Sequence, residues 1–388
     1  MAVRDPHHDL ADALIVSDAI AFRRIFSRRD PGRSLLFVPH VSMFATESLA
    51  YFQEQGTAVG SFGEHAGAIE RSRHSLKFLD DSARVPRAML DQYAKFVDTH
   101  HRVFLESHTG ILGPLKRLLQ PDLGISVLEG NIVGITHLMS LQLGTGDEEL
   151  ATMTLESIGG PGMAVFDRSR ALSGYIALVL DRFGAAEVHR VEELQVSPIL
   201  CANVDAGRFY GSLLRQRTPR ALGTAMLLTA ALCAANVGLH IVPESAQPNE
   251  PLATLFQSKW RLVALFHVAS SLRHIVAMRE ARDWLRDEVH RELVALRRRL
   301  EPVLRFKKLR NRMVHYRPHR SVPVSPAPSV RALLQDLANG PIKAVDAQVD
   351  QGLQDVSRVL GALHPRVTGT LMTPVLPRRS TSDNAGAP

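Results

Sequence analysis

Residues 342–363 read IKAVDAQVDQGLQDVSRVLGAL, a pattern that sets the fold class of the C-terminal part of the chain. Apolar residues recur there at intervals of three and four, which is the period of one face of an α-helix. They are Ile342, Val345, Val349, Leu353, Val356, Leu360 and Leu363. Polar residues occupy the opposite face, so we predict an amphipathic helix that packs on a domain core or on a partner helix.

The same periodicity extends through most of the chain and predicts a mainly α fold built of helical bundle domains. Glu301-Pro302 opens one further helix, which we expect to end at Arg317 because Pro318 disfavours helical backbone in the residue before it. Residues 125–143 fit either a short hairpin around Gly130-Asn131 or a helix. The remaining predicted helices cover residues 9–28, 41–56, 64–80, 86–108, 253–280 and 282–300.

Composition breaks suggest the domain boundaries. Gly159-Gly160-Pro161-Gly162 lacks the lysine of a phosphate-binding loop and indicates a turn or a boundary. We therefore predict an N-terminal, mostly helical domain of unknown role over 1–155, a connecting region over 156–218, a helical domain over 219–364 and a disordered tail over 365–388. Ala221 to Val242 is apolar and long enough for a bilayer, but its polar and small residues favour a buried central helix.

Charge is concentrated in one segment. The chain has 388 residues and a formal net charge of +7. Residues 286–320 contain 12 Lys and Arg against 4 Asp and Glu, while the remainder contains 34 against 35. A concentrated positive field attracts polyanions, above all nucleic acid phosphates. Aromatic residues make up only 6% of the chain, which argues against large stacking platforms for single strands.

This basic segment contains Leu309-Arg310-Asn311-Arg312-Met313-Val314-His315-Tyr316. The stretch resembles the signature of HEPN domains (higher eukaryote and prokaryote nucleotide-binding), in which an Arg precedes a His by four to six residues and a polar residue follows the Arg. Arg310, Asn311 and His315 take these positions. An Arg-to-His spacing alone recurs by chance in so Arg-rich a chain, but the Arg-Asn pair occurs once. The resemblance covers about residues 219–364.

The resemblance implies a metal-independent endoribonuclease with Arg310, Asn311 and His315 as catalytic residues and no metal or other cofactor, in a stress or phage-defence role. His can transfer protons near neutral pH, and Arg can hold phosphate oxygens. A regular helix separates Arg310 and His315 by about 140°, so a homodimer or a distorted last turn is needed to bring them together. Neighbouring charges are expected to position RNA phosphates: Lys307, Lys308, Arg312, Arg317 and His319.

Other interpretations remain open. Arg310 could be a solvated surface charge, Asn311 a cap and His315 a structural histidine beside Tyr316. The domain could then be a non-catalytic module that binds RNA, a nucleotide or an acidic partner. An enzyme site hidden in the N-terminal half is a third possibility.

A second cluster of metal-binding residue types lies between residues 98 and 108. Asp98 and His101 can share a helix face, but the HExxH pattern is missing, so scattered surface histidines are the better interpretation. The cluster consists of Asp98, His100, His101, Glu106 and His108. Cys201 and Cys233 form no close pair, and the polar N-terminus does not resemble a signal peptide, so we expect a cytoplasmic protein.

Overall fold

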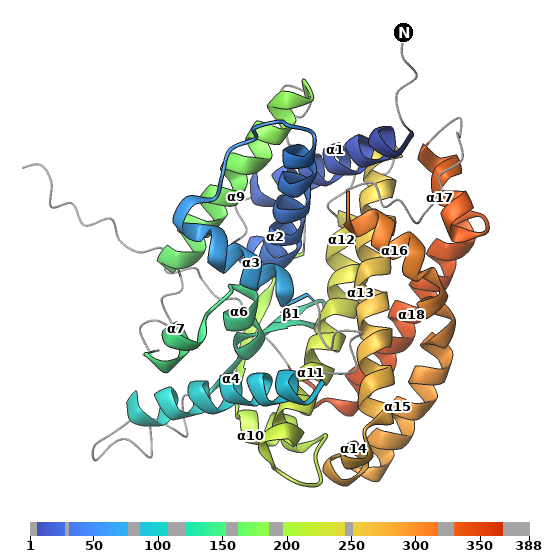
Figure 1. The fold of residues 1–388 in the computed structure, drawn as a ribbon. Coiled ribbons are helices and arrows are strands. Elements are labelled where there is room, and N and C mark those ends of the chain that lie inside the picture. Colours follow the sequence, from blue (N-terminus) through green and yellow to red (C-terminus); the bar gives the residue numbers. More distant parts are fainter. Residues whose placement is uncertain are drawn as a thin grey trace, which may run out of the picture.

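A computed structural model shows a mainly α protein, as the periodicity predicts (Figure 1). It describes residues 6–27, 31–76, 86–107, 122–152, 162–185, 197–244, 251–316 and 330–367. The N-terminal half contains α1 (Pro6–Ser27), α2 (Pro31–Glu54), η1 (Gly63–His65), α3 (Ala66–His74), α4 (Pro86–Ser107), α6 (Thr136–Gln142), α7 (Asp147–Ala151), α9 (Gly162–Arg182) and α10 (Ala206–Gly211). Then follow α11 (Pro219–Asn236), η2 (Val237–Ile241), α12 (Val242–Glu244), α13 (Pro251–Ala277), α14 (Arg279–Trp284), α15 (Asp287–Leu300), η3 (Glu301–Phe306), α16 (Lys307–Val314), α17 (Val330–Ala338) and α18 (Ile342–Leu363).

The ambiguous stretch over 125–143 is a hairpin followed by the short helix α6. Strands β1 (Leu123–Leu128) and β2 (Asn131–Ile135) pair antiparallel, and β3 (Leu200–Val204) pairs with the other edge of β1. Glu129 and Gly130 form the two-residue turn with φ of 50° and 81°. Such left-handed backbone matches the twist of a tight hairpin, and glycine tolerates it without strain.

The apolar helix over Ala221–Val242 lies in the centre of the fold. Thr218 caps α11 by accepting a hydrogen bond from the Ala221 amide, and Pro219 stands in the first turn. Among the described residues, the helical stretches Gly32–Glu54 and Pro219–Ile241 are long and apolar enough to cross a membrane, but 72% and 83% of the apolar 18-residue window in each is buried inside the protein. That burial is typical of core helices in a globular protein, as predicted for the second stretch.

One continuous core extends across the predicted domain boundaries. It includes apolar side chains from Leu10 in α1 to Leu360 in α18. Phe22 of α1, for example, contacts Phe37 and Phe44 of α2 and Phe256 and Trp260 of α13. In Figure 1, α13, α15 and α18 lie together on one side, and α2, α3 and α9 lie on the other. The packing of α1 against α13 joins the two sides.

The basic segment folds as predicted at its start but not at its end. Helix α15 ends at Leu300, Pro302 lies in the first turn of the 3₁₀ segment η3, and α16 follows directly. The expected end at Arg317 is wrong, because α16 ends at Val314 and His315 has extended backbone with φ of −94° and ψ of 107°. Local pattern could not show this end, because the side chains of His315 and Tyr316 bind partners on other helices.

The amphipathic helix predicted over 342–363 matches α18 at both ends. Its apolar stripe packs against α11, α13 and α15. The Gly-Pro boundary over 159–161, the Pro-rich loop before α17 and the tail from residue 368 lie outside the described residues.

Candidate functional site

Helix α16 presents the Arg-Asn pair from its middle turn. The Arg310 guanidinium lies 4.5 Å from the centroid of the Phe266 ring on α13 and donates a hydrogen bond of 2.7 Å to the Asn311 side-chain oxygen. A guanidinium over an aromatic face is held by the ring quadrupole. Arg310 is only half-buried, so its charge is oriented by these two contacts while part of it still faces solvent.

His315 follows the end of this helix and contacts a buried carboxylate. Its Nδ1 lies 2.9 Å from Oε2 of Glu47, which is in the C-terminal half of α2. The His315 side chain is 43% exposed and that of Glu47 is 2% exposed. A carboxylate oxygen can only accept, so we assign the proton of this bond to Nδ1. The second ring nitrogen, Nε2, is then the basic atom of the neutral ring.

Glu47 is held from the other side by Arg73 of α3. The Arg73 guanidinium binds Oε1 of Glu47 and also lies 2.6 Å from Oε1 of Glu70. Each Glu47 oxygen therefore has its own cationic or potentially cationic partner. Burial of a carboxylate is expensive unless it is paired in this way. This arrangement fixes Glu47, and through it the orientation of the His315 ring.

Tyr316 is anchored in the protein interior. Its hydroxyl donates to Asp18 of α1 and accepts from the Lys259 ammonium of α13 at 2.8 Å. Lys259 also forms an ion pair with Asp18, and Trp260 Nε1 donates to Asp18 at 3.1 Å. All four side chains are buried.

Burial shifts both charges of this pair towards their neutral forms. It raises the pKa of Asp18 and lowers the pKa of Lys259, and the attraction between the two groups opposes both shifts. Burial also raises the pKa of the Tyr316 hydroxyl, and the negative charge of Asp18 adds to the effect. The network therefore fastens the chain directly after His315 to helices α1 and α13.

The residues expected to position phosphates differ in their surroundings. Lys307 and Lys308 are exposed in the first turn of α16. Arg312 is only 3% exposed and donates to the Tyr316 carbonyl at 3.3 Å, so its guanidinium does not face solvent. Arg312 is therefore not part of a phosphate-binding surface in this structure. Arg317 and His319 lie outside the described residues.

The sequence did not point to Glu47, Arg73, Asp18 or Lys259, because each belongs to an element far along the chain from the motif. One local signal was present for Glu47. It is the only charged residue in the apolar stretch 34–53. A lone carboxylate in a helix that is otherwise core is a buried charge, and a buried charge needs a partner.

The rival cluster over residues 98–108 does not form a metal site in the part of the chain that the structure describes. His100 is buried rather than on the surface, and its Nε2 lies 3.0 Å from Ser140 Oγ. His101 points elsewhere, because its Nδ1 lies 2.8 Å from Asp122. No group of three or more metal-binding side chains occurs among the described residues. His108 is outside them.

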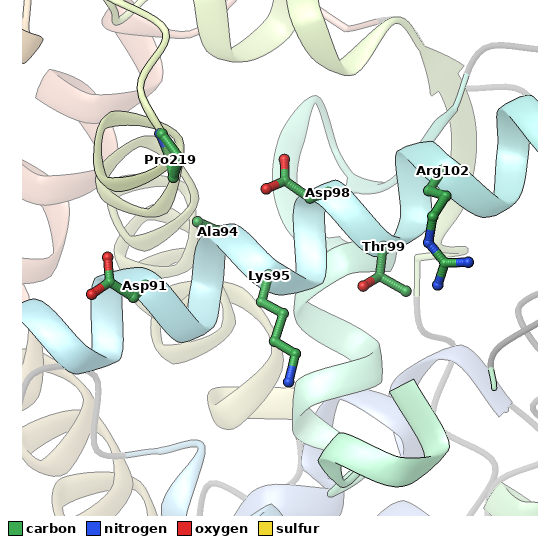
Figure 2. A pocket seen from close by; sticks show the side chains of 7 residues that line it. All are labelled: Asp91, Ala94, Lys95, Asp98, Thr99, Arg102 and Pro219. Carbon is green, nitrogen blue, oxygen red and sulfur yellow. The ribbon is translucent and has the colours of Figure 1, made fainter. Parts of the chain in front are cut away.

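A surface pocket of about 430 Å³ lies along the same helix, where α4 meets the start of α11 (Figure 2). Its charged side chains fan out from α4 rather than converge, as Figure 2 shows for Asp91, Lys95, Asp98 and Arg102. Asp91 forms a two-pronged ion pair with Arg220 at 2.8 and 3.1 Å. Burial raises the pKa of Asp98. The ion pair between Asp91 and Arg220 joins α4 to α11, and the charged side chains of the pocket do not converge on one point as catalytic residues would.

The arrangement around His315 is therefore the strongest candidate site. A half-exposed imidazole has one nitrogen fixed by a buried carboxylate, and an oriented guanidinium, that of Arg310, lies five residues earlier in the chain. No protein-family model, no curated protein and no solved structure matches the chain.

Proposed function

We propose that the protein is a metal-independent endoribonuclease in which His315 transfers protons and Arg310 binds the reacting phosphate. The observation that supports this most is the 2.9 Å contact between His315 Nδ1 and Glu47. A carboxylate on one imidazole nitrogen fixes the tautomer and stabilises the imidazolium that forms when the other nitrogen takes a proton. The exposure of His315 leaves the ring accessible to substrate.

The reaction we propose needs no group beyond side chains. A base removes the proton of a ribose 2′-hydroxyl, and the O2′–P bond forms. The P–O5′ bond breaks, and an acid protonates the leaving oxygen, which gives a 2′,3′-cyclic phosphate and a 5′-hydroxyl. Neutral His315 can accept the first proton at Nε2, and protonated His315 can donate the second. Arg310 stabilises the charge on the phosphorane oxygens.

Two proton transfers at one phosphate are served best by two histidines. The motif supplies one per chain, so we propose a homodimer in which two copies of His315 meet across a cleft. Light scattering at several protein concentrations tests this directly. Activity per chain that stays constant on dilution into a fully monomeric range contradicts the dimer.

The decisive experiment is incubation of the purified chain with labelled RNA in the presence of EDTA. We expect cleavage by the wild type and loss of at least a hundredfold in His315→Ala and Arg310→Ala, in line with the usual contributions of one acid–base group and of one group that stabilises transition-state charge. His74→Ala is a matched control, because His74 also contacts a carboxylate, Glu70 at 3.1 Å, but lies exposed on α3. Unchanged cleavage in both motif variants would falsify the proposal, as would an inactive wild type.

A non-catalytic binding module is the second candidate. It is favoured by the packing of Arg310 on Phe266, which lets this residue act as a structural and electrostatic element of the helix surface. Salt-sensitive RNA binding without cleavage, unchanged in His315→Ala, is the result that this alternative predicts.

A further inference from the structure

A second basic surface lies on α14 and α15, apart from the motif helix. A groove of about 570 Å³ is lined there by three arginines, Arg282, Arg291 and Arg298, together with His290 and Asp287. All three arginines are exposed. Arg291 and Arg298 are seven residues apart on α15, so they lie on one face about 10 Å from each other.

The charge of this groove is not compensated. Asp287 is the one acidic residue that lines it, and its carboxylate forms an ion pair with Arg215. None of the three groove arginines forms an ion pair with any residue that the structure describes. Their neighbours on α15 do: Arg297 lies 3.2 Å from Glu301, and Arg299 lies 3.5 Å from Asp355. Arg297 and Arg299 are therefore neutralised by carboxylates of the protein, whereas the groove arginines can bind an anion from outside.

The apolar residues of the groove and the spacing of its arginines indicate which kind of anion fits. Val294 and Ala295 lie between the arginines, so the groove offers short apolar contacts between separate positive charges. From Arg291 to Arg298 the row runs towards the end of α15, from which η3 leads directly to α16 and the motif (Figure 1). A polymer with regularly spaced negative charges and less polar units between them fits this row of arginines better than a single small anion does.

We propose that the groove binds the sugar–phosphate backbone of RNA, with Arg282, Arg291 and Arg298 on successive phosphates and Val294 and Ala295 against ribose. Arginine suits this role because its planar guanidinium donates two hydrogen bonds to one phosphate. The inference rests on the proposed nuclease function only in its choice of RNA as the polyanion. The groove holds the strand outside the cleavage site and sets how the strand enters it.

The test uses the full chain carrying His315→Ala, so that bound RNA is not cut. Binding of a fluorescein-labelled 20-nucleotide RNA is followed by anisotropy from 0.05 to 0.3 M NaCl. Adding Arg291→Ala and Arg298→Ala should weaken binding at least tenfold at 0.1 M NaCl. The slope of log K against log salt should fall by about 1.4, since each phosphate contact on a single strand contributes about 0.7.

Two matched pairs sharpen the result. Arg297→Ala with Arg299→Ala removes the same charge from the same helix and should change the affinity less than threefold. Arg291→Lys with Arg298→Lys keeps the charge and should keep the salt slope. Equal losses in the two alanine pairs overturn the proposal, because the effect is then general charge. Absence of RNA binding, or competition by polyglutamate as effective as that by RNA, overturns it as well.

The two proposals fail separately. A wild type that binds RNA through the groove but does not cleave it contradicts the nuclease and leaves the groove standing. A wild type that cleaves RNA, together with groove variants that bind RNA normally, contradicts the groove proposal and leaves the nuclease proposal standing.

Discussion

Glu47 Oε2 and His315 Nδ1 lie 2.9 Å apart, although 268 positions of sequence separate the two residues. Glu47 comes from α2 in the N-terminal half of the chain, and His315 comes from the basic segment, directly after α16. The contact therefore exists only when the two halves of the chain pack together. A displacement of α2 would therefore also move the carboxylate that binds the imidazole.

Replacement of Glu47 by glutamine tests this link. The amide keeps the size of the side chain but removes the carboxylate that accepts from Nδ1 of His315, and it can offer its NH₂ group to the wrong tautomer. We expect cleavage to fall at least tenfold in kcat with little change in KM, because RNA does not touch Glu47. Single-turnover and steady-state kinetics on labelled RNA measure both quantities.

Glu70→Gln is the matched control, because Glu70 also binds Arg73 but has no contact with His315 among the interactions described. It should leave kcat within about twofold of the wild type. An equal loss of kcat in Glu47→Gln and Glu70→Gln would mean that Arg73, rather than the carboxylate on the imidazole, governs the rate.

Local patterns predicted much of the fold. Helix α18 matches the predicted range 342–363, because its apolar stripe alone specifies the buried face. The hairpin at Glu129-Gly130 was one of two interpretations, since a short apolar run with a glycine suits both a strand and a helix. The structure shows that this run is a strand, because β1 also pairs with β3, about 70 residues later in the chain.

The site was predicted only in part, for a physical reason. The signature predicts Arg310, Asn311 and His315 as site residues, but it does not include the partners of His315 and Tyr316, which come from α1, α2 and α13. Such contacts depend on how helices pack, and local periodicity does not contain that information. For the same reason the sequence suggests that Arg312 is a solvent-facing charge, although its side chain is buried and donates to the Tyr316 carbonyl.

The buried pair of Asp18 and Lys259 should be essential for stability. Lys259→Met leaves the Asp18 carboxylate buried without its cation, and loss of one partner of a buried pair costs about 3–5 kcal/mol. The double variant Asp18→Asn with Lys259→Met removes both charges and keeps an acceptor for Trp260. It should lose at least about 1 kcal/mol less than the sum of the two single variants.

Urea unfolding followed by circular dichroism measures these differences. Lys95→Met is the control, since Lys95 is an exposed lysine on α4. Losses in the two single variants that simply add in the double variant would mean that the two charges do not depend on each other.

Acid should destabilise the protein through its buried histidines. Burial lowers the pKa of His40, His100 and His364 from 6.5 to about 4 in the folded state. The unfolded chain therefore binds more protons between these two values, so stability is complete above pH 6.5 and falls as the pH drops towards 4. At pH 5 each histidine accounts for a loss of about 2 kcal/mol.

One of these histidines can be replaced to test the effect. In the folded state His364 contacts Thr229 Oγ1 at 2.9 Å and the Leu360 carbonyl at 2.7 Å, so the neutral His364→Gln retains hydrogen-bonding groups there. The difference in unfolding free energy between pH 7.5 and pH 5 should shrink by about 2 kcal/mol in this variant. His74→Gln, at an exposed site, should leave the difference unchanged. An identical pH dependence in wild type and His364→Gln would contradict this assignment.

Helices α4 and α11 cross so closely that Gly223 has no room for a side chain. A Cβ atom there would lie 2.1 Å from the Leu90 carbonyl oxygen, and backbone cannot move aside as a flexible side chain can. Gly223→Ala should therefore separate the two helices and cost about 3 kcal/mol or more, at the upper end of the usual range for overpacking. Gly174 lies in α9 with nothing within 4 Å of its Cβ position, so Gly174→Ala should stabilise the helix by about 0.5–1 kcal/mol. Thermal unfolding of both variants gives shifts of opposite sign if the close crossing is correct. A Gly223→Ala protein as stable as the wild type would show that α4 and α11 do not touch at this point.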